Sequence, residues 1–216
     1  YLKNEFSDTE EQSLDVDIAI KLKGLGLAFR VEKYSHSYPH CWRTDKPILY
    51  YPLNSWFIKT SSEKNKMLKN NSSVFWQPKS TGDGRFKNWL ENLNDWNLSR
   101  SRFWGTPIPV WVTKDEKEVV CVGSVKELFE LCESSVAAGF MNENPLKDFV
   151  VGDMSEQNYN SIDLHKHVVD KIILCSDSGK KMFREPDLID VWFDSGAMPF
   201  AQFHYPFENK SVIDNR

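Results

Sequence analysis

The sequence predicts a mixed α/β protein, because segments with apolar residues at helical spacing alternate with short segments of β-branched and aromatic residues. Apolar residues make up 40% of the chain and charged residues 27%, which is typical of a folded protein and excludes the disordered and fibrous classes. With 216 residues, the chain can bury a core in one large domain or two small ones.

The first helix is predicted from a capping-box pattern, in which Glu10 follows Ser7 at the required spacing. Alternating or β-branched residues further along predict strands at 27–34, 47–51 and 55–58. The helix itself is predicted from apolar residues at helical spacing and from two glycines that favour its end. These residues are Leu14, Ile18, Leu22, Leu25, Gly24 and Gly26.

Two further helices and an extended segment are predicted in the middle of the chain. The polar residues 61–73 suit a short exposed helix, and residues 85–98 carry apolar side chains at spacings of three and four. Residues 107–112 are predicted to be extended, although Pro107 and Pro109 argue against an ordinary central strand.

A change of composition near residue 113 predicts an inserted subdomain. Ser124 and Glu127 form a second capping-box pattern at the start of a helix. Short strands and glycine-containing turns are predicted around this helix and after it. The strands are 119–122, 171–175 and 189–193, and the turns that follow the last two are 178–181 and 194–196.

Charge and cysteine usage limit the classes of function. The net charge of −4 argues against a surface that binds polyanions over its whole area, although it allows a local basic strip. No apolar run approaches the roughly 18 residues of a membrane span, and the N-terminus lacks a signal-peptide pattern, so we expect a cytoplasmic protein. The chain opens on Tyr1, which predicts a piece excised from a longer protein, and four scattered cysteines predict reduced thiols.

Three strings are too unusual to be generic. They are HSYPHCWR at 36–43, a segment at 88–109 that contains DWNLSR and WGTPIP, and DVWFDSG at 190–196. Their order and spacing resemble the central part of class I aminoacyl-tRNA synthetases of the isoleucine, valine and leucine group. The first string, with GTPIPVW and with AMPFAQFHYPF at 197–207, resembles the isoleucine-specific members.

The resemblance implies a division of the chain into four parts. Residues 1–60 are similar to the C-terminal end of the editing insertion and its return strands, and residues 61–112 to the re-entry into a Rossmann-like catalytic domain. Residues 113–186 are similar to a second connective insertion, and residues 187–216 to a further segment of the catalytic domain.

The resemblance also implies the chemistry of the whole protein. Such enzymes use ATP and Mg²⁺ to form an isoleucyl adenylate and then transfer isoleucine to tRNA(Ile). We expect a monomer with no membrane partner. The His-Ile-Gly-His and Lys-Met-Ser-Lys-Ser segments that hold ATP in this class do not occur in the sequence, and neither does the threonine-rich strip of the editing pocket. We therefore expect no catalytic activity from residues 1–216 alone.

Trp192 is the main candidate site residue. By resemblance it forms a wall of the isoleucine side-chain pocket, where a flat, rigid ring suits a branched aliphatic group. The alternative is a tryptophan in the core of a buried strand. Asp194 and Ser195 are expected in a turn near the adenylate. Ser195 is not expected to be a nucleophile, because no base partner is identifiable and a GxSxG elbow is absent.

Arg100, Arg102 and Trp104 are candidate contacts to tRNA. A guanidinium group pairs well with phosphate, and an indole can stack on a base. The alternative interpretation is that the arginines lie on a helix and pair with Glu91 and Asp95.

Metal binding is considered for Cys41, with His36 and His40 nearby. Some relatives carry a second cysteine at the position of Thr44, and a structural zinc ion requires four ligands, so no zinc site is predicted. A second set of polar residues consists of Asp163, His165 and His167. We assign these residues to the exposed face of a strand rather than to metal or acid–base chemistry.

Two other identities remain open from the sequence. One is a segment of a valine-specific synthetase, against which the string at 36–43 argues. The other is a free-standing module that binds RNA or protein without catalysis. A segment of a larger enzyme should expose apolar surface where the rest of the catalytic domain packs, and we expect that surface at 191–203.

Overall fold

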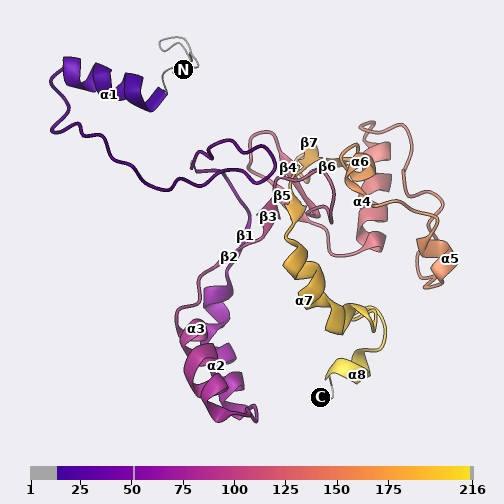
Figure 1. The fold of residues 1–216 in the computed structure, drawn as a ribbon. Helices are drawn as coiled ribbons and strands as arrows, with labels where there is room; N and C mark the ends of the chain where they lie inside the picture. The colour runs from indigo at the N-terminus through magenta and orange to yellow at the C-terminus, as the bar shows by residue number, and fades with distance from the viewer. Residues whose placement is uncertain (1–13, 51, 215–216) are drawn as a thin grey trace. The chain divides into compact units, whose positions relative to one another are not determined.

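The computed structural model describes residues 14–50 and 52–214 (Figure 1). The chain divides into two units, Tyr1–Pro52 and Leu53–Arg216. Helices and strands are interleaved, which confirms the mixed α/β fold class. In order, the elements are α1 (Leu14–Gly24), β1 (Phe57–Ile58), the 3-10 helix η2 (Thr60–Glu63), α2 (Lys64–Ser73), the π-helix η3 (Thr81–Phe86), α3 (Lys87–Glu91), β2 (Trp96–Asn97), β3 (Ser99–Arg100), β4 (Val110–Thr113), β5 (Val119–Cys121), α4 (Val125–Ala137), α5 (Glu156–Tyr159), α6 (Lys166–Val169), β6 (Ile173–Cys175), β7 (Lys181–Arg184), β8 (Leu188–Ile189), α7 (Val191–Ala201) and α8 (Lys210–Asp214).

The first unit contains the predicted helix but not the predicted strands. α1 is confirmed, whereas the capping-box pattern of Ser7 and Glu10 lies outside the described residues. Residues 27–34 form no strand, and residues 47–50 contribute only an isolated bridge between Pro47 and His40. Residue alternation predicts which faces a strand would show, but a strand also needs a neighbour for its backbone groups.

The prediction of a helix at 61–73 is confirmed by η2 and α2, but the helix predicted at 85–98 is too long. α3 ends at Glu91, and Trp96–Asn97 instead pairs antiparallel with Phe57–Ile58. Two hydrogen bonds that involve side chains join residues 60–61 to residues 94–95. Thr60 Oγ1 donates to the Asn94 carbonyl at 2.8 Å, and Ser61 N donates to Asp95 Oδ1 at 3.0 Å. These tertiary contacts outweigh the helical spacing of the apolar residues.

A four-stranded antiparallel sheet in the order β5-β4-β7-β6 forms the centre of the second unit. β4 is a central strand, contrary to the expectation from its prolines. Pro107 and Pro109 both precede its first residue, so no ladder hydrogen bond inside β4 lacks a donor. The sheet and α4 enclose the main core, which comprises Trp111, Val122, Leu128, Cys132, Leu146, Phe149, Val169, Ile172, Leu174 and Met182.

The start of α4 and the β6–β7 turn confirm two sequence predictions. The Ser124 side chain accepts a hydrogen bond from Glu127 N, and the Glu127 carboxylate accepts one from Gly123 N at 2.7 Å. β6 and β7 pair across the predicted turn, in which Gly179 adopts φ of 76°, a conformation that favours glycine. Both features are local and depend on few residues.

The strand predicted at 189–193 and the turn predicted at 194–196 are wrong. β8 ends at Ile189, and Asp190 caps α7, so Asp194 and Ser195 lie within that helix. An apolar run of this length fits a strand or a buried helix equally well by periodicity alone. The acceptor side chain of Asp190, which can bond to the first backbone N–H groups of a helix, favours the helical alternative.

The strand assigned to 163–167 is also wrong, because Lys166–Val169 forms the short helix α6 with His165 as its N-cap residue. Asp163 faces back toward this helix start and accepts hydrogen bonds from His165 N at 2.8 Å and His165 Nδ1 at 2.7 Å. Among residues 14–50 and 52–214, no helix has the length and apolar character needed to cross a lipid bilayer.

Candidate functional site

A buried carboxylate joins the second and third unusual strings. Asp190 Oδ2 accepts hydrogen bonds from Trp96 Nε1 at 3.1 Å and Arg100 NH2 at 2.7 Å. Asp190 Oδ1 accepts one from Trp192 N at 3.3 Å. The side chain of Asp190 is 7% exposed. Three donors from two distant parts of the chain therefore share one carboxyl group.

The contacts of Asp190 also determine its charge. Burial tends to raise the pKa of the carboxyl group, but hydrogen bonds from Trp96 and Trp192 and the charge of Arg100 outweigh burial and lower the pKa below its usual value. Asp190 is therefore ionised at neutral pH. A negative charge at this position also interacts favourably with the N-terminus of α7.

Backbone pairing positions this carboxylate. β3 and β8 pair antiparallel, with Ser99 opposite Ile189 and Arg100 opposite Leu188. Asp190 N donates to the Leu98 carbonyl at 2.8 Å. The chain therefore runs from a paired strand straight into a capped helix, which leaves little freedom for residues 190–192.

Gly105 allows the close approach of the loop between β3 and β4. It adopts φ of 148°, and a Cβ atom there would lie 3.3 Å from Leu188 Cδ1. The carbonyl of the next residue, Thr106, accepts a hydrogen bond from Ile189 N at 2.7 Å. The Thr106 hydroxyl donates a hydrogen bond to Asp194 Oδ1 at 3.1 Å. A side chain at position 105 would strain the backbone and crowd Leu188.

Trp192 lies on the first turn of α7 and is 72% exposed. The interpretation of Trp192 as a buried core residue is therefore wrong. Its ring makes no hydrogen bond to any residue that the structure describes, and the start of α7 fixes the position of its backbone. Ser195 is also exposed, on the same helix.

Trp104 and Asp194 line an open hollow of about 370 Å³ beside the loop that contains Gly105. The ring of Trp104 stacks on His165 with centroids 4.6 Å apart, and the residue is 69% exposed. The hollow therefore combines a flat aromatic surface with a carboxylate.

Arg100 and Arg102 differ in their surroundings. Arg100 is 38% exposed and pairs with Asp190, and its NH1 donates to the carbonyls of Asn97 and Ser99, both at 2.9 Å. The alternative that Arg100 pairs with Glu91 or Asp95 is therefore wrong. Arg102 is exposed.

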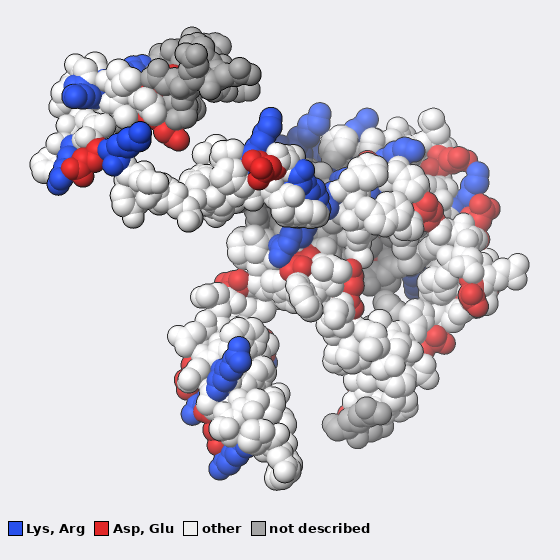
Figure 2. All heavy atoms as spheres, in the orientation of Figure 1, with Lys and Arg blue, Asp and Glu red and all other residues white. Residues whose placement is uncertain are grey.

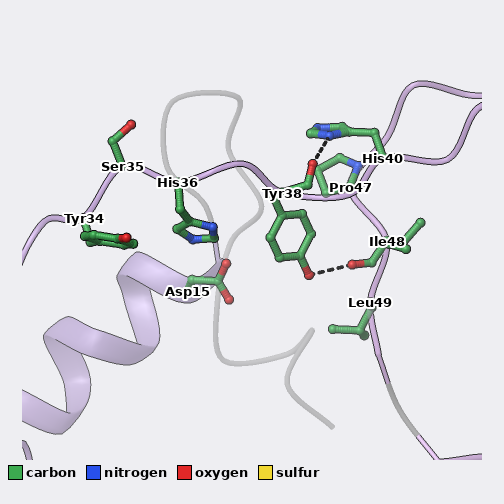
Figure 3. Close-up of a pocket in the computed structure, with 9 residues that line it drawn as sticks. All are labelled: Asp15, Tyr34, Ser35, His36, Tyr38, His40, Pro47, Ile48 and Leu49. Atoms are coloured by element: carbon green, nitrogen blue, oxygen red, sulfur yellow. Dashed lines mark hydrogen bonds between the residues drawn. The ribbon is translucent and has the colours of Figure 1, made fainter.

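The string at 36–43 lies in the first unit, and its residues His36, Tyr38 and His40 line an open hollow (Figure 3). Tyr34, His36 and Tyr38 alternate along the chain, with neighbouring ring centroids 5.6 and 6.1 Å apart. The side chain of Tyr38 is fixed by its hydroxyl, which donates to the Ile48 carbonyl at 2.6 Å. Alternating rings on one side are what an extended backbone produces.

Cys41 lies in a turn and has Thr44 as a neighbour. A hydrogen bond from the Thr44 side chain, followed by backbone N–H groups of Arg43 and Thr44, lowers the pKa of the Cys41 thiol from its usual value. The residues that the structure describes contain no cluster of three histidine, cysteine or acidic side chains that could hold a metal ion.

Comparison with known proteins identifies the class. Residues 2–216 match the family described as tRNA synthetases class I (I, L, M and V). The chain belongs to this family.

Within the family, the similarity is strong to proteins of one specificity. The chain is 57% identical over 220 residues to the isoleucine–tRNA ligase of Bacteroides fragilis, which covers 100% of the chain. It is 60% identical over 207 residues to that of Bacteroides thetaiotaomicron, covering 95% of the chain. It is 56% identical over 218 residues to that of Porphyromonas gingivalis, covering 100%. The chain spans only 19% of the length of the first of these relatives.

Asp190 and Thr106 are the site residues that the sequence predictions missed. Both lie inside the unusual strings. The strand predicted at 189–193 conceals the capping role of Asp190, and the hydrogen bonds of Thr106 go to residues more than eighty positions away. The signal available was an aspartate directly before the apolar residues Val191–Phe193, where it can cap a helix. Its contacts to Trp96 and Arg100 could not be predicted, since they join residues far apart in sequence.

Proposed function

We propose that this chain is a segment of an isoleucine–tRNA ligase, an enzyme that activates isoleucine with ATP and transfers it to tRNA(Ile). The observation that carries the proposal is the 56–60% identity to three isoleucine–tRNA ligases across nearly the whole chain. Within the second unit, the WGTPIP and DVWFDSG strings lie side by side through the pairing of β3 with β8, which is compatible with the same assignment.

Trp192 is proposed to form one wall of the isoleucine side-chain pocket. Its exposed ring stands on a rigid, capped helix turn, as a shape-selective wall requires. Such a wall discriminates weakly, because one methylene group is worth only about 1–3 kcal/mol, a limit already illustrated by enzymes of this specificity. A separate editing step would therefore be needed to reject valine.

Arg102 and Trp104 are proposed to contact tRNA, with Arg100 beside them. The exposed ring of Trp104 is available to stack on a base, and Arg102 is available to pair with phosphate.

Asp194 and Ser195 are proposed to lie near the adenylate, on the first two turns of α7.

ATP and Mg²⁺ are proposed as requirements of the full-length enzyme. The N-terminus of α7, where a phosphate could otherwise bind, already receives the carboxylate of Asp190. The two ATP signature segments are not in this sequence. We therefore propose that residues 1–216 are inactive by themselves.

The four-part division at 1–60, 61–112, 113–186 and 187–216 is proposed for the full-length protein, together with a monomeric state and a cytoplasmic location. The pairing of β3 with β8 supports the assignment of residues near 100 and residues near 189 to one domain with an insertion between them.

The proposal is tested by isoleucine-dependent ATP–pyrophosphate exchange with the full-length protein that contains this segment, with valine as the competing substrate. We expect exchange that prefers isoleucine, and none from residues 1–216 alone. A preference for valine would reassign the specificity. Absence of exchange with any amino acid, from a folded full-length protein, would contradict the proposed activity and favour a binding module.

A further inference from the structure

We infer that Asp190 is a positioning residue for amino-acid selection, which fixes the direction of Trp192 by tying the start of α7 to Trp96 and Arg100. This inference rests on the proposed function of Trp192. It adds a residue that touches neither isoleucine nor ATP but determines where the pocket wall stands.

The first step of the argument is the lack of other restraints on Trp192. Its ring is largely exposed and makes no hydrogen bond to the described residues, and only its backbone N–H is held, by Asp190 Oδ1 at 3.3 Å. The direction in which the side chain leaves the backbone therefore depends on where α7 begins and how that first turn is rotated.

The second step is that Asp190 determines both the start and the rotation of α7. It caps the helix, and its backbone N–H is bonded to the Leu98 carbonyl at 2.8 Å. Its other carboxylate oxygen holds Trp96 at 3.1 Å and Arg100 at 2.7 Å. Because the Asp190 carboxylate is also bonded to Trp96 and Arg100, the first turn of α7 cannot rotate about the helix axis without breaking these bonds.

The third step is the placement of Phe193. Its ring lies 6.2 Å from that of Trp96, so Asp190 and Phe193, three residues apart, both contact the same indole. Residues at this spacing share one side of a helix turn. Trp192 lies between them in sequence, and its Cα–Cβ bond therefore leaves the turn in a different direction from that of Phe193.

The charge of Asp190 is part of the arrangement. A neutral amide at this position could still cap the helix and accept one further hydrogen bond, but it would lose the charge-assisted bond to Arg100, which is the shorter of the two bonds at Oδ2. Asp190→Asn should therefore keep α7 folded while loosening its orientation.

The test measures ATP–pyrophosphate exchange by the full-length protein with isoleucine and with valine. Asp190→Asn is expected to lower kcat/KM for isoleucine about tenfold, mostly through KM, and to reduce the isoleucine-to-valine preference by at least about threefold, with KM for ATP unchanged. Trp96→Phe, which removes one donor to Asp190 and keeps most of the ring, should change the preference in the same direction.

Asp187→Asn is the matched control. Asp187 directly precedes β8 and accepts a hydrogen bond at 2.8 Å from the hydroxyl of Ser101, which directly follows β3. Its side chain makes no hydrogen bond to Trp96 or Trp192 in the described part of the chain. This variant should retain the preference for isoleucine. Circular dichroism should show equal helix content in all three variants.

Several outcomes would overturn the inference. One is an unchanged isoleucine-to-valine preference in Asp190→Asn. Another is an equal effect of Asp187→Asn, which would make the contribution of Asp190 purely structural. If Asp190→Asn does not fold, Trp96→Phe decides by the same preference. These outcomes differ from failure of the proposed function, in which the unaltered full-length protein would already lack isoleucine-dependent exchange.

Discussion

At the scale of single residues, buried and exposed tryptophans have distinct roles in this chain. Trp111 is buried in the main core, and its Nε1 donates to the Ile172 carbonyl at 3.0 Å. Trp192 and Trp89 instead expose most of their rings. Exposure excludes a core role for these two residues, and the surroundings of each ring then separate a candidate binding residue from an ordinary surface residue.

Trp192→Ala is therefore expected to impair isoleucine activation in the full-length protein. Loss of an apolar wall worth about 1.5–3 kcal/mol corresponds to a fall of about 10–150-fold in kcat/KM for isoleucine. Exchange kinetics would measure it. Trp89→Ala is the control, because Trp89 is also exposed but lies on α3, where its ring stacks on that of Phe86. An equal fall in kcat/KM for isoleucine in both variants would contradict the assignment of Trp192 to the pocket.

Asp115 predicts a dependence of stability on acid pH. Its hydrogen bond from Lys180, followed by that from Thr113, lowers the pKa of Asp115 to about 2. Because the folded-state pKa is depressed, the stabilising contribution is complete above the usual value of 3.8 and is lost as the pH falls toward about 2.

Asp115→Asn should therefore reduce the free energy of unfolding near neutral pH, and the difference from the unaltered chain should shrink between about pH 4 and about pH 2. Urea unfolding at a series of pH values checks this expectation. Glu116→Gln, at an exposed neighbour, is the control. A difference that stays constant across this pH range would contradict the assignment.

At the scale of elements, local capping patterns were the most predictable features. The Ser124–Glu127 pattern is observed as predicted, because it needs only a few consecutive residues. The helix predicted at 85–98 was too long because its C-terminal half takes part in contacts to residues 57–61. Local patterns do not contain that information.

Ser124→Ala is expected to lower the free energy of unfolding by about 1 kcal/mol, because the N–H group of Glu127 loses its acceptor. Chemical denaturation followed by circular dichroism measures this change. Ser134→Ala in the same helix is the matched control, since the exposed Ser134 hydroxyl donates only to the Glu130 carbonyl and the change should stay within about 0.5 kcal/mol. Similar losses would show that the cap contributes little.

α7 illustrates the limit of periodicity at this scale. Its sequence is apolar on most sides, so the apolar residues show neither the period of a strand nor that of a helix, and periodicity does not distinguish the two. The helix is stabilised by the Asp190 cap, whose own position depends on β3. Whether a short apolar run becomes strand or helix is thus decided partly by residues about ninety positions away in sequence.

At the scale of the whole molecule, the apolar surface expected at 191–203 is confirmed. No residue of α7 is buried, and on the face shown in Figure 2 this helix is largely free of charged side chains. Apolar surface of this kind marks a site where another part of a protein packs. The exposed apolar side chains are those of Val191, Trp192, Phe193, Met198 and Phe200.

This surface predicts that one substitution has different effects in two contexts. In residues 1–216 alone, Met198→Ala should change the free energy of unfolding by no more than about 0.5 kcal/mol, because Met198 is exposed. In the full-length protein, the same change should lower the free energy of unfolding by more than this, because we expect the rest of the catalytic domain to cover α7. Thermal unfolding of both proteins measures the contrast.

Met182→Ala is the control for this contrast. Met182 is fully buried in the core of the sheet, so its truncation should cost about 2–5 kcal/mol in either context. A small effect of Met198→Ala in both contexts would show that α7 stays uncovered in the full-length protein.

The sequence by itself determined the family, the mixed α/β class, the capped helix α4, the β6–β7 turn and the apolar exposure near 191–203, because these depend on short strings of residues or on composition. Only the tertiary structure decided that α7 is a helix, that β4 is central, and that Asp190 holds Trp96, Arg100 and the Trp192 backbone together. The physical reason is that hydrogen bonds and burial between distant segments depend on three-dimensional proximity, which no local pattern of residues specifies.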